Sequence, residues 1–188
     1  MPKNQASQAS HELQFNVAQL LKEPTGGNRH YDVEVKTIRN FDDDIKVIAP
    51  LVGYVDILRT GPDILVTGLL QTMIQKSCGR CLTAFIRPVS IELEEEFYPS
   101  VDILTGAVLP QRPEIDQTNY ISELHILDLT EIVQQEIFLE GDGMHYCRPE
   151  CKGLCPHCGQ DRNIDPCSCE DEVIDPRWAK LLATRLED

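Results

Sequence analysis

Long apolar runs are missing from this sequence. A helix that crosses a bilayer needs roughly 18 consecutive apolar residues, and the longest candidate, residues 45–58, is interrupted by charged residues, a proline and a glycine. Residues 1–12 are polar and lack the apolar centre of a secretory signal. We therefore expect a cytoplasmic protein that starts with a flexible N-terminus over residues 1–12.

Sequence signatures of catalysis are missing as well. The chain has no Gly-rich phosphate-binding loop, no G-x-S-x-G nucleophile elbow and no H-E-x-x-H helix. The carboxylate run Glu94-Glu95-Glu96 is most simply the solvated edge of a strand. We therefore expect a protein that is not an enzyme.

Positive charge is scarce. The chain has 17 Lys and Arg residues against 31 Asp and Glu, a net charge of −14. Such a surface repels phosphate backbones, which argues against broad, sequence-independent binding to RNA or DNA. The acidity either serves solubility alone or indicates a basic partner, such as a cationic protein. Basic residues gather only near Arg80 and Arg87 and within residues 177–185. Such a small patch could contact RNA, but a solvated face is the favoured interpretation.

Alternating apolar and polar residues are abundant. Tyr31, Val33 and Val35 alternate with charged residues, and the odd positions of residues 85–97 are mainly apolar while Glu occupies several even ones. Short strands joined by turn residues favour an antiparallel sheet or a partly open barrel. The predicted strands cover residues 31–35, 46–48, 51–58, 64–74 and 85–97.

Two or three helices are expected beside this sheet, which makes the fold α+β. Asn16 can cap a short helix over residues 17–21. Asp128 and Glu131 have the spacing of a capping box at the start of a second helix. The apolar stripe of that helix consists of Leu129, Ile132, Val133 and Ile137.

The chain divides into a main domain and a cysteine-rich tail. Residues 13–140 are expected to form the α+β domain, which includes a strand-knuckle-strand hairpin. Residues 141–188 are expected to form a zinc-binding module, closed by a helix that begins at Asp175 and Pro176 and packs on the main domain. The buried side of this last helix would consist of Trp178, Leu181 and Leu182.

Eight cysteines carry the clearest chemical signal. Two pairs have C-x-x-C spacing, Cys78 with Cys81 and Cys155 with Cys158. A tight turn of this spacing points two sulfurs at one ion, at about 2.3 Å each. Gly159, which tolerates positive φ, would let backbone N–H groups turn toward the second pair. The predicted metal ligands are Cys78, Cys81, Cys147, Cys151, Cys155, Cys158, Cys167 and Cys169.

Other uses of these cysteines fit less well. Disulfides need an oxidising compartment, and no signal directs the chain to one. Thioredoxin-like redox chemistry places a C-x-x-C at the start of a helix in a βαβ unit, a setting that neither pair has. An iron–sulfur cluster stays an alternative. Two closed sites of four cysteines each, holding two structural zinc ions, suit the count best.

How the eight cysteines divide is not set by spacing. The division we expect joins Cys78 and Cys81 to Cys155 and Cys158, which would pin the tail onto the sheet. The second site would then consist of Cys147, Cys151, Cys167 and Cys169. An equally physical alternative keeps the first site inside the tail. His145 and His157 are near enough to replace a cysteine, but an exposed surface position is the favoured interpretation because sulfur already suffices.

Three segments together resemble the YceD family, the large ribosomal RNA subunit accumulation proteins. The first is Cys78-Gly79-Arg80-Cys81-Leu82 with the strand that runs to Tyr98, and the second is Leu127-Asp128-Leu129-Thr130-Glu131. The third runs from Cys151 to Gly159 and continues through Cys167-Ser168-Cys169 to Asp175-Pro176-Arg177. The resemblance covers the chain from about residue 60 to its end. Relatives often have Asn-Leu-Asn in the stretch after Gly159, where this chain has Asp161-Arg162-Asn163.

The resemblance implies a role in the accumulation of large-subunit ribosomal RNA, and hence in assembly of the large subunit or protection of its RNA. Members are typically encoded beside a large-subunit ribosomal protein, which agrees with a basic partner. Some relatives lack most of the tail cysteines, which favours zinc as support for the fold rather than the function. We expect a zinc-stabilised factor that binds a basic ribosomal protein or assembly factor, with a local contact to ribosomal RNA as an option. The alternative is a metal- or redox-handling cysteine protein.

Overall fold

A curved antiparallel sheet forms the body of the protein. The structure, a computed structural model, describes residues 13–36, 38, 45–169 and 177. Five strands lie in the order β2-β4-β5-β6-β7, and a sixth, β3, pairs with β5. The strands are β2 (Asn28–Val35), β3 (Ile45–Val47), β4 (Leu51–Arg59), β5 (Ile64–Ser77), β6 (Ala84–Pro99) and β7 (Tyr120–Ile121). All pairs are antiparallel except β6 with β7, which is parallel.

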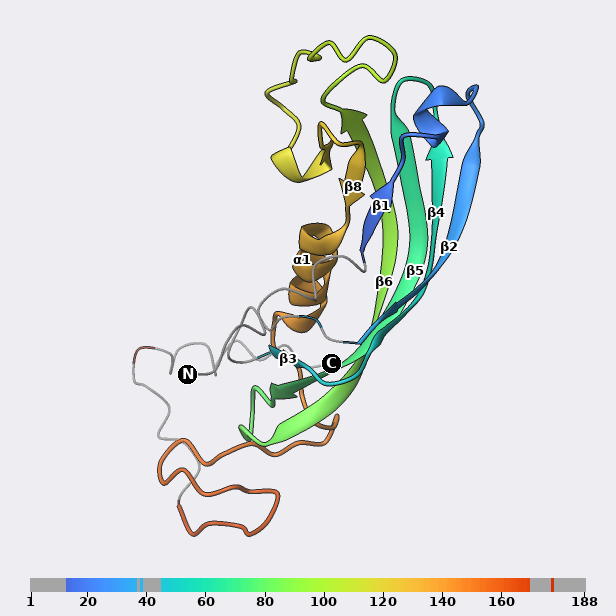
Figure 1. Ribbon diagram of the computed structural model, residues 1–188. Helices are drawn as coiled ribbons and strands as arrows, with labels where there is room; N and C mark the ends of the chain where they lie inside the picture. Colours follow the sequence, from blue (N-terminus) through green and yellow to red (C-terminus); the bar gives the residue numbers. More distant parts are fainter. Residues whose placement is uncertain (1–12, 37, 39–44, 170–176, 178–188) are drawn as a thin grey trace, which may run out of the picture.

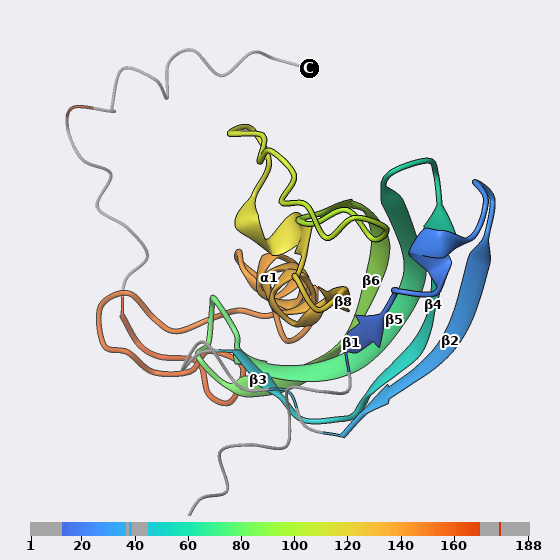
Figure 2. The same ribbon diagram turned by 45° about the horizontal axis from the view of Figure 1, so that its top comes forward.

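The concave side of this sheet holds the core. A small second sheet of β1 (Gln14–Asn16) and β8 (Ile126–Asp128) lies there together with helix α1 (Thr130–Gly141) (Figure 1). Seen from above, the long strands curve around α1 and β8 (Figure 2). The inward residues of the strands and one side of the helix form a single buried cluster, which includes Val55, Leu70, Ile91, Val133 and Ile137.

Two glycines allow the close approach of β4 and β5 where the sheet bends. A Cβ on Gly53, whose φ is +153°, would lie 2.0 Å from the carbonyl oxygen of Leu69. A Cβ on Gly68 would lie 2.5 Å from the carbonyl oxygen of Tyr54. No larger residue fits at either position without moving the strands apart. The observed spacing of β4 and β5 therefore requires glycine at these two positions.

The predicted antiparallel sheet is confirmed, but the expected number of helices is not matched. The described residues contain one α-helix and two short 3₁₀ helices, η1 (Leu20–Lys22) and η2 (Gln117–Asn119). The expected helix over residues 17–21 is wrong in its first part, because residues 14–16 pair with β8 as a strand and leave only one turn before Pro24. The predicted terminal helix at Asp175, with Trp178, Leu181 and Leu182, lies outside the described residues, as does the N-terminus over residues 1–12.

Helix α1 follows the sequence pattern closely. The carboxylate of Asp128 accepts a hydrogen bond from the Thr130 N–H at 2.8 Å, but the N-cap is Leu129, which makes no side-chain capping bond, so the predicted capping box is not formed. All members of the predicted stripe are buried: Leu129, Ile132, Val133 and Ile137. The helix ends at Gly141, as the Gly141-Asp142-Gly143 sequence indicates. Among the described residues, no helix has both the length and the apolar character that crossing a bilayer requires.

Candidate metal centres

The first cysteine cluster joins the sheet to the tail. Cys78 and Cys81 lie in the turn between β5 and β6, and Cys147 and Cys151 follow α1. The four Sγ atoms all lie within 4.8 Å of one another. Cys78 and Cys151 have their Sγ atoms 3.8 Å apart, as do Cys81 and Cys147. A tetrahedral ion with metal–sulfur bonds of about 2.3 Å requires sulfur–sulfur edges of about 3.8 Å, so these side chains are arranged to hold one metal ion.

The second cluster lies wholly within the tail. It consists of Cys155, Cys158, Cys167 and Cys169, whose Sγ atoms again lie within 4.8 Å of one another. Cys155 is buried, Cys158 is exposed, and the other two are intermediate. This centre is therefore more open to solvent than the first, in which three of the four cysteines are buried.

The two C-x-x-C pairs form the same backbone turn. In the first, the Leu82 N–H donates to the Cys78 carbonyl at 2.9 Å. In the second, the Gly159 N–H donates to the Cys155 carbonyl, also at 2.9 Å. Leu82 has a φ of 58° and Gly159 a φ of 75°. The positive φ predicted at Gly159 is confirmed, whereas the left-handed conformation of Leu82 was missed because leucine rarely adopts it.

These turns lower the pKa of thiols in both clusters: Cys78 and Cys81 in the first and Cys155 in the second. Burial would raise the pKa of Cys78, but N–H groups of Cys81, Cys147 and Arg80 outweigh burial and lower its pKa to about 6. The N–H groups of Cys158 and His157 lower the pKa of Cys155 to about 5. Each cluster therefore has at least one cysteine that is a thiolate at neutral pH, the form that binds metal.

The partner cysteines respond in the opposite direction. Burial, followed by the neighbouring cysteines, raises the pKa of Cys147 to about 12. The hydrogen bond that the Cys169 thiol donates to Cys158, followed by burial and Cys155, raises the pKa of Cys169 to about 12. Four sulfurs held this close repel one another as thiolates unless a cation lies between them. This crowding fits a divalent ion better than a set of free thiols.

The expected division of the cysteines is wrong. Cys78 and Cys81 meet Cys147 and Cys151, not Cys155 and Cys158. The reason is the path of the tail: the Gly79 N–H donates to the His145 carbonyl at 2.9 Å, which brings Cys147 to the hairpin first. The tail is still joined to the sheet, but through Cys147 and Cys151.

The connection between the two centres depends on close packing against Arg80. The Leu154 N–H donates to the Arg80 carbonyl at 2.9 Å. Gly153 has a φ of +73°, and a Cβ there would lie 3.0 Å from the same carbonyl oxygen. The guanidinium of Arg80 donates to the Cys151 carbonyl at 3.1 Å and lies over the Tyr146 ring at 4.0 Å from its centre. Arg80 thus connects the tip of the hairpin to the segment between the two centres.

The segment Asp161-Arg162-Asn163 supplies donors to both centres. The side-chain amide of Asn163 donates to the Cys151 Sγ at 3.6 Å, and the Arg162 guanidinium donates to the Cys155 Sγ at 3.6 Å. Asn163 also accepts the Lys152 N–H at 2.9 Å. Cation and amide donors near a thiolate stabilise its charge and hold it in position. These roles were not predicted, because a single sequence does not show which side chains reach the sulfurs.

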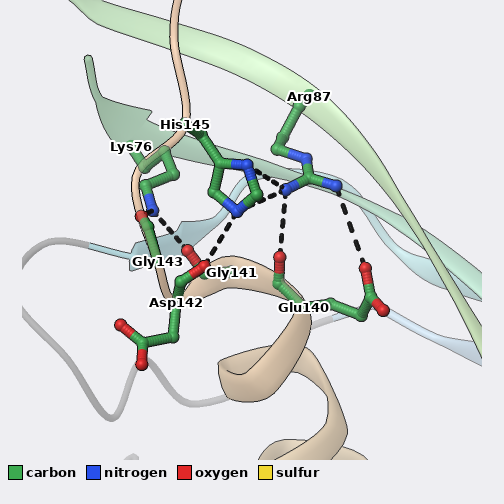
Figure 3. Close-up of polar contacts among 7 residues, drawn as sticks. All are labelled: Lys76, Arg87, Glu140, Gly141, Asp142, Gly143 and His145. Carbon is green, nitrogen blue, oxygen red and sulfur yellow. Dashed lines mark hydrogen bonds and ion pairs between the residues drawn. The ribbon is translucent and has the colours of Figure 1, made fainter. Parts of the chain in front are cut away.

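The two histidines near the cysteines lie outside both clusters. His157 is exposed, in the second knuckle. His145 belongs instead to a group of basic side chains at the end of α1 (Figure 3). Its Nε2 lies 2.8 Å from the Asp142 carbonyl and 2.7 Å from the Arg87 guanidinium. The interpretation that cysteine alone supplies the ligands agrees with this placement.

The same group satisfies the carbonyls at the end of α1. Lys76 on β5 donates to the Gly141 carbonyl and, at 3.0 Å, to the Gly143 carbonyl. Arg87 on β6 donates to the Glu140 carbonyl at 3.0 Å (Figure 3). Cations stabilise the negative end of a helix and complete hydrogen bonds that the helix leaves open. The contacts join α1 to the two strands that carry the first knuckle.

In the described part of the chain, a curved sheet packs around helix α1 and joins a tail with two tetra-cysteine clusters, so the protein is of the α+β class with two groups of side chains that could each hold a metal ion. The chain belongs to the YceD family: residues 66–183 match the family model described as large ribosomal RNA subunit accumulation protein YceD. The resemblance stated from the cysteine motifs is thereby confirmed.

Mycobacterial proteins are among the relatives of this chain. Uncharacterized proteins from Mycobacterium tuberculosis strain H37Rv and from Mycobacterium bovis are each 33% identical over 120 residues, 63% of this chain and 54% of the relative. A protein from Mycobacterium leprae is 30% identical over 122 residues, 63% of this chain and 52% of the relative. The chain thus spans about half the length of these relatives. No solved structure matches it.

Proposed function

We propose that this protein is a cytoplasmic, non-enzymatic, zinc-binding factor that supports the accumulation of large-subunit ribosomal RNA and the assembly of the large subunit. It acts by binding a basic ribosomal protein or assembly factor. The observation that carries this proposal is the family match over residues 66–183.

Zinc as the bound metal is supported by the ligand chemistry. Each cluster offers four sulfurs that lie within 4.8 Å of one another, and neither group includes an oxygen or nitrogen ligand. Such closed sulfur sites are typical of structural zinc. The test is metal analysis of the protein purified without added metal, where we expect two zinc ions per chain. Cys78→Ser and Cys158→Ser should each reduce this to one, whereas iron with a visible charge-transfer band would contradict the assignment.

A basic partner is supported by the charge of the chain. At −14 the protein repels nucleic acid at long range and attracts cationic proteins, which speeds their association. Ribosomal proteins must be kept from binding RNA indiscriminately before assembly, and an acidic surface that covers them provides this protection. Binding should weaken as salt is added, because exposed charges are screened.

The decisive experiment measures the ratio of large- to small-subunit ribosomal RNA after depletion of the protein in its host. We expect a selective loss of the large-subunit RNA, restored by the wild-type gene. Complementation with Cys78→Ser and with Cys158→Ser separates the contributions of the two centres. An unchanged ratio after depletion would contradict the proposed function.

A second candidate function, metal handling, is favoured by one observation. Cys158 is exposed and its centre is the more open of the two. A handling site exchanges its ion readily, whereas a structural site keeps it until the protein unfolds. The rate of zinc transfer to a moderate chelator, compared with the rate of unfolding, distinguishes the two. Transfer from the second centre much faster than unfolding would favour metal handling.

A further inference from the structure

The sheet has a second face, opposite the one that packs on α1. We define the convex face as the outward residues of β2, β4, β5 and β6. It is the outer side of the curve in Figure 2, away from α1 and β8. Because strands alternate, each row across the sheet has one outward residue per strand. One such row is Asp32, Tyr54, Leu69 and Glu92, which are successive Cα partners.

The middle of the convex face is apolar and open. Large hydrophobic side chains on it keep much of their surface exposed: Val52 46%, Tyr54 40%, Met73 36% and Ile86 54%. A groove of about 510 Å³ crosses the strands here, and its lining includes Pro50, Val52, Met73 and Pro88. Single exposed hydrophobic residues are ordinary, but a contiguous group around a groove marks an interaction site.

The two margins of the convex face are acidic. Asp32 and Glu34 on β2 are exposed beside Tyr54 and Val52, their respective partners on β4. On the opposite side, three outward residues of β6 are exposed carboxylates: Glu92, Glu94 and Glu96. The exposed apolar strip of β4 and β5 therefore has carboxylates beside it on β2, at Val52 and Tyr54, and on β6, at Leu69.

We propose that the convex face is the surface that receives the basic protein partner. The inference rests on the proposed function and names the chemistry of the occupant: a protein segment with apolar residues at its centre and Lys or Arg on both sides. The apolar strip buries the centre of the segment, and the carboxylates on β2 and β6 pair with its flanks. A phosphate backbone would be repelled by the carboxylates on both sides.

Two pairs of variants test the surface, each with a control of identical chemistry. Val52→Gln with Met73→Gln removes apolar contact from the groove, and Val108→Gln with Met144→Gln makes the same changes at sites that are 78% and 77% exposed elsewhere. Glu92→Lys with Glu94→Lys reverses two margin charges, and Glu114→Lys with Glu123→Lys makes the same charge change at exposed sites off this face.

The probes are the individually purified proteins of the large ribosomal subunit, titrated against the zinc-loaded chain at low salt. For a protein that binds the wild type, we expect the convex variants to weaken binding about tenfold or more, as changes at the centre of an interface do, while the controls bind like wild type. Hydroxyl-radical footprinting should show Met73 and Tyr54 protected in the complex and Met144 unchanged. Equal binding by convex and control variants would overturn the proposal and leave the proposed function intact.

Other occupants give different results. Self-association of the wild type that Val52→Gln with Met73→Gln abolishes would make the face an interface between copies and overturn the proposal. Binding of large-subunit ribosomal RNA that these variants weaken would also overturn it. If no large-subunit protein binds the wild type, this inference is overturned, and the RNA ratio after depletion decides separately whether the proposed process stands.

Discussion

The side-chain amide of Asn163, in the tail, donates a hydrogen bond to the Sγ of Cys151, 3.6 Å away in the first metal centre. Asn163 lies between Cys158 and Cys167, two ligands of the second centre. One side chain thus contacts a sulfur of the first centre from the loop of the second. The two centres are therefore expected to depend on each other.

Asn163→Ala should loosen metal in the first centre although it removes no ligand. Residues that hydrogen-bond to a metal ligand typically change metal affinity by about 10- to 100-fold, and we expect a loss in this range. The measurement is zinc transfer to a chelator, with the phase from the first centre identified by its absence in Cys81→Ser. Gln160→Ala, at an exposed position in the same loop, is the control and should transfer zinc like wild type.

Gly153→Ala should disturb the connection between the hairpin and the tail. The residue has a φ of +73°, and the added Cβ would lie 3.0 Å from the Arg80 carbonyl oxygen. Gly106→Ala is the matched control, because Gly106 has a φ of +70° and no atom within 4 Å of the added Cβ. The left-handed backbone alone costs about 1–2 kcal/mol for a residue with a Cβ. In thermal unfolding of the zinc-loaded protein, Gly153→Ala should therefore lower Tm more than Gly106→Ala, and equal losses would contradict the steric argument.

Lys76→Met should destabilise the joint between β5 and the end of α1. Lys76 is only 8% exposed, and its ammonium group donates to the Gly141 and Gly143 carbonyls. Methionine keeps most of the side-chain volume but leaves these carbonyls without their donor, which costs about 1–3 kcal/mol. Urea unfolding followed by circular dichroism gives the free energy of unfolding. Lys46→Met, at an exposed position on β3, should change it by less than about 0.5 kcal/mol.

Zinc binding at pH 7.5 should release fewer than four protons per ion. The pKa of Cys78 is about 6 and that of Cys155 about 5, so each is already a thiolate at pH 7.5 in the metal-free folded protein. Cys147 and Cys169, with pKa values of about 12, still carry protons that the metal must displace. Calorimetry in buffers of different ionisation enthalpy counts the protons released.

The sign of this pH dependence follows from the lowered pKa values. As pH falls through about 6, Cys78 gains a proton and competes with the metal, and Cys155 does so only near pH 5. The number of protons released per zinc ion should therefore rise toward four as the pH falls. Four protons per ion already at pH 7.5 would contradict the thiolate assignment of Cys78 and Cys155.

The amino-acid sequence by itself determined the local structure. The alternation of apolar and polar residues along 85–97 specifies a strand with one solvent-exposed face, since successive side chains of a strand point to opposite faces. The stripe from Leu129 to Ile137 specifies the buried side of α1. C-x-x-C spacing specifies which sulfurs share a turn, as for Cys155 and Cys158. Each of these properties depends on neighbours along the chain.

Only the tertiary structure decided how the cysteines divide and which faces of the sheet are free. The third and fourth sulfurs of the first centre come from Cys147 and Cys151, far from Cys78 in sequence. They arrive there because His145 and Leu154 make backbone hydrogen bonds to the hairpin. The acidic residues of β2 and β6 likewise lie on separate strands and come to border one face of the sheet only after β4 and β5 have paired between them. Contacts between distant segments depend on how the whole chain packs, and the spacing of residues along the sequence does not specify this packing.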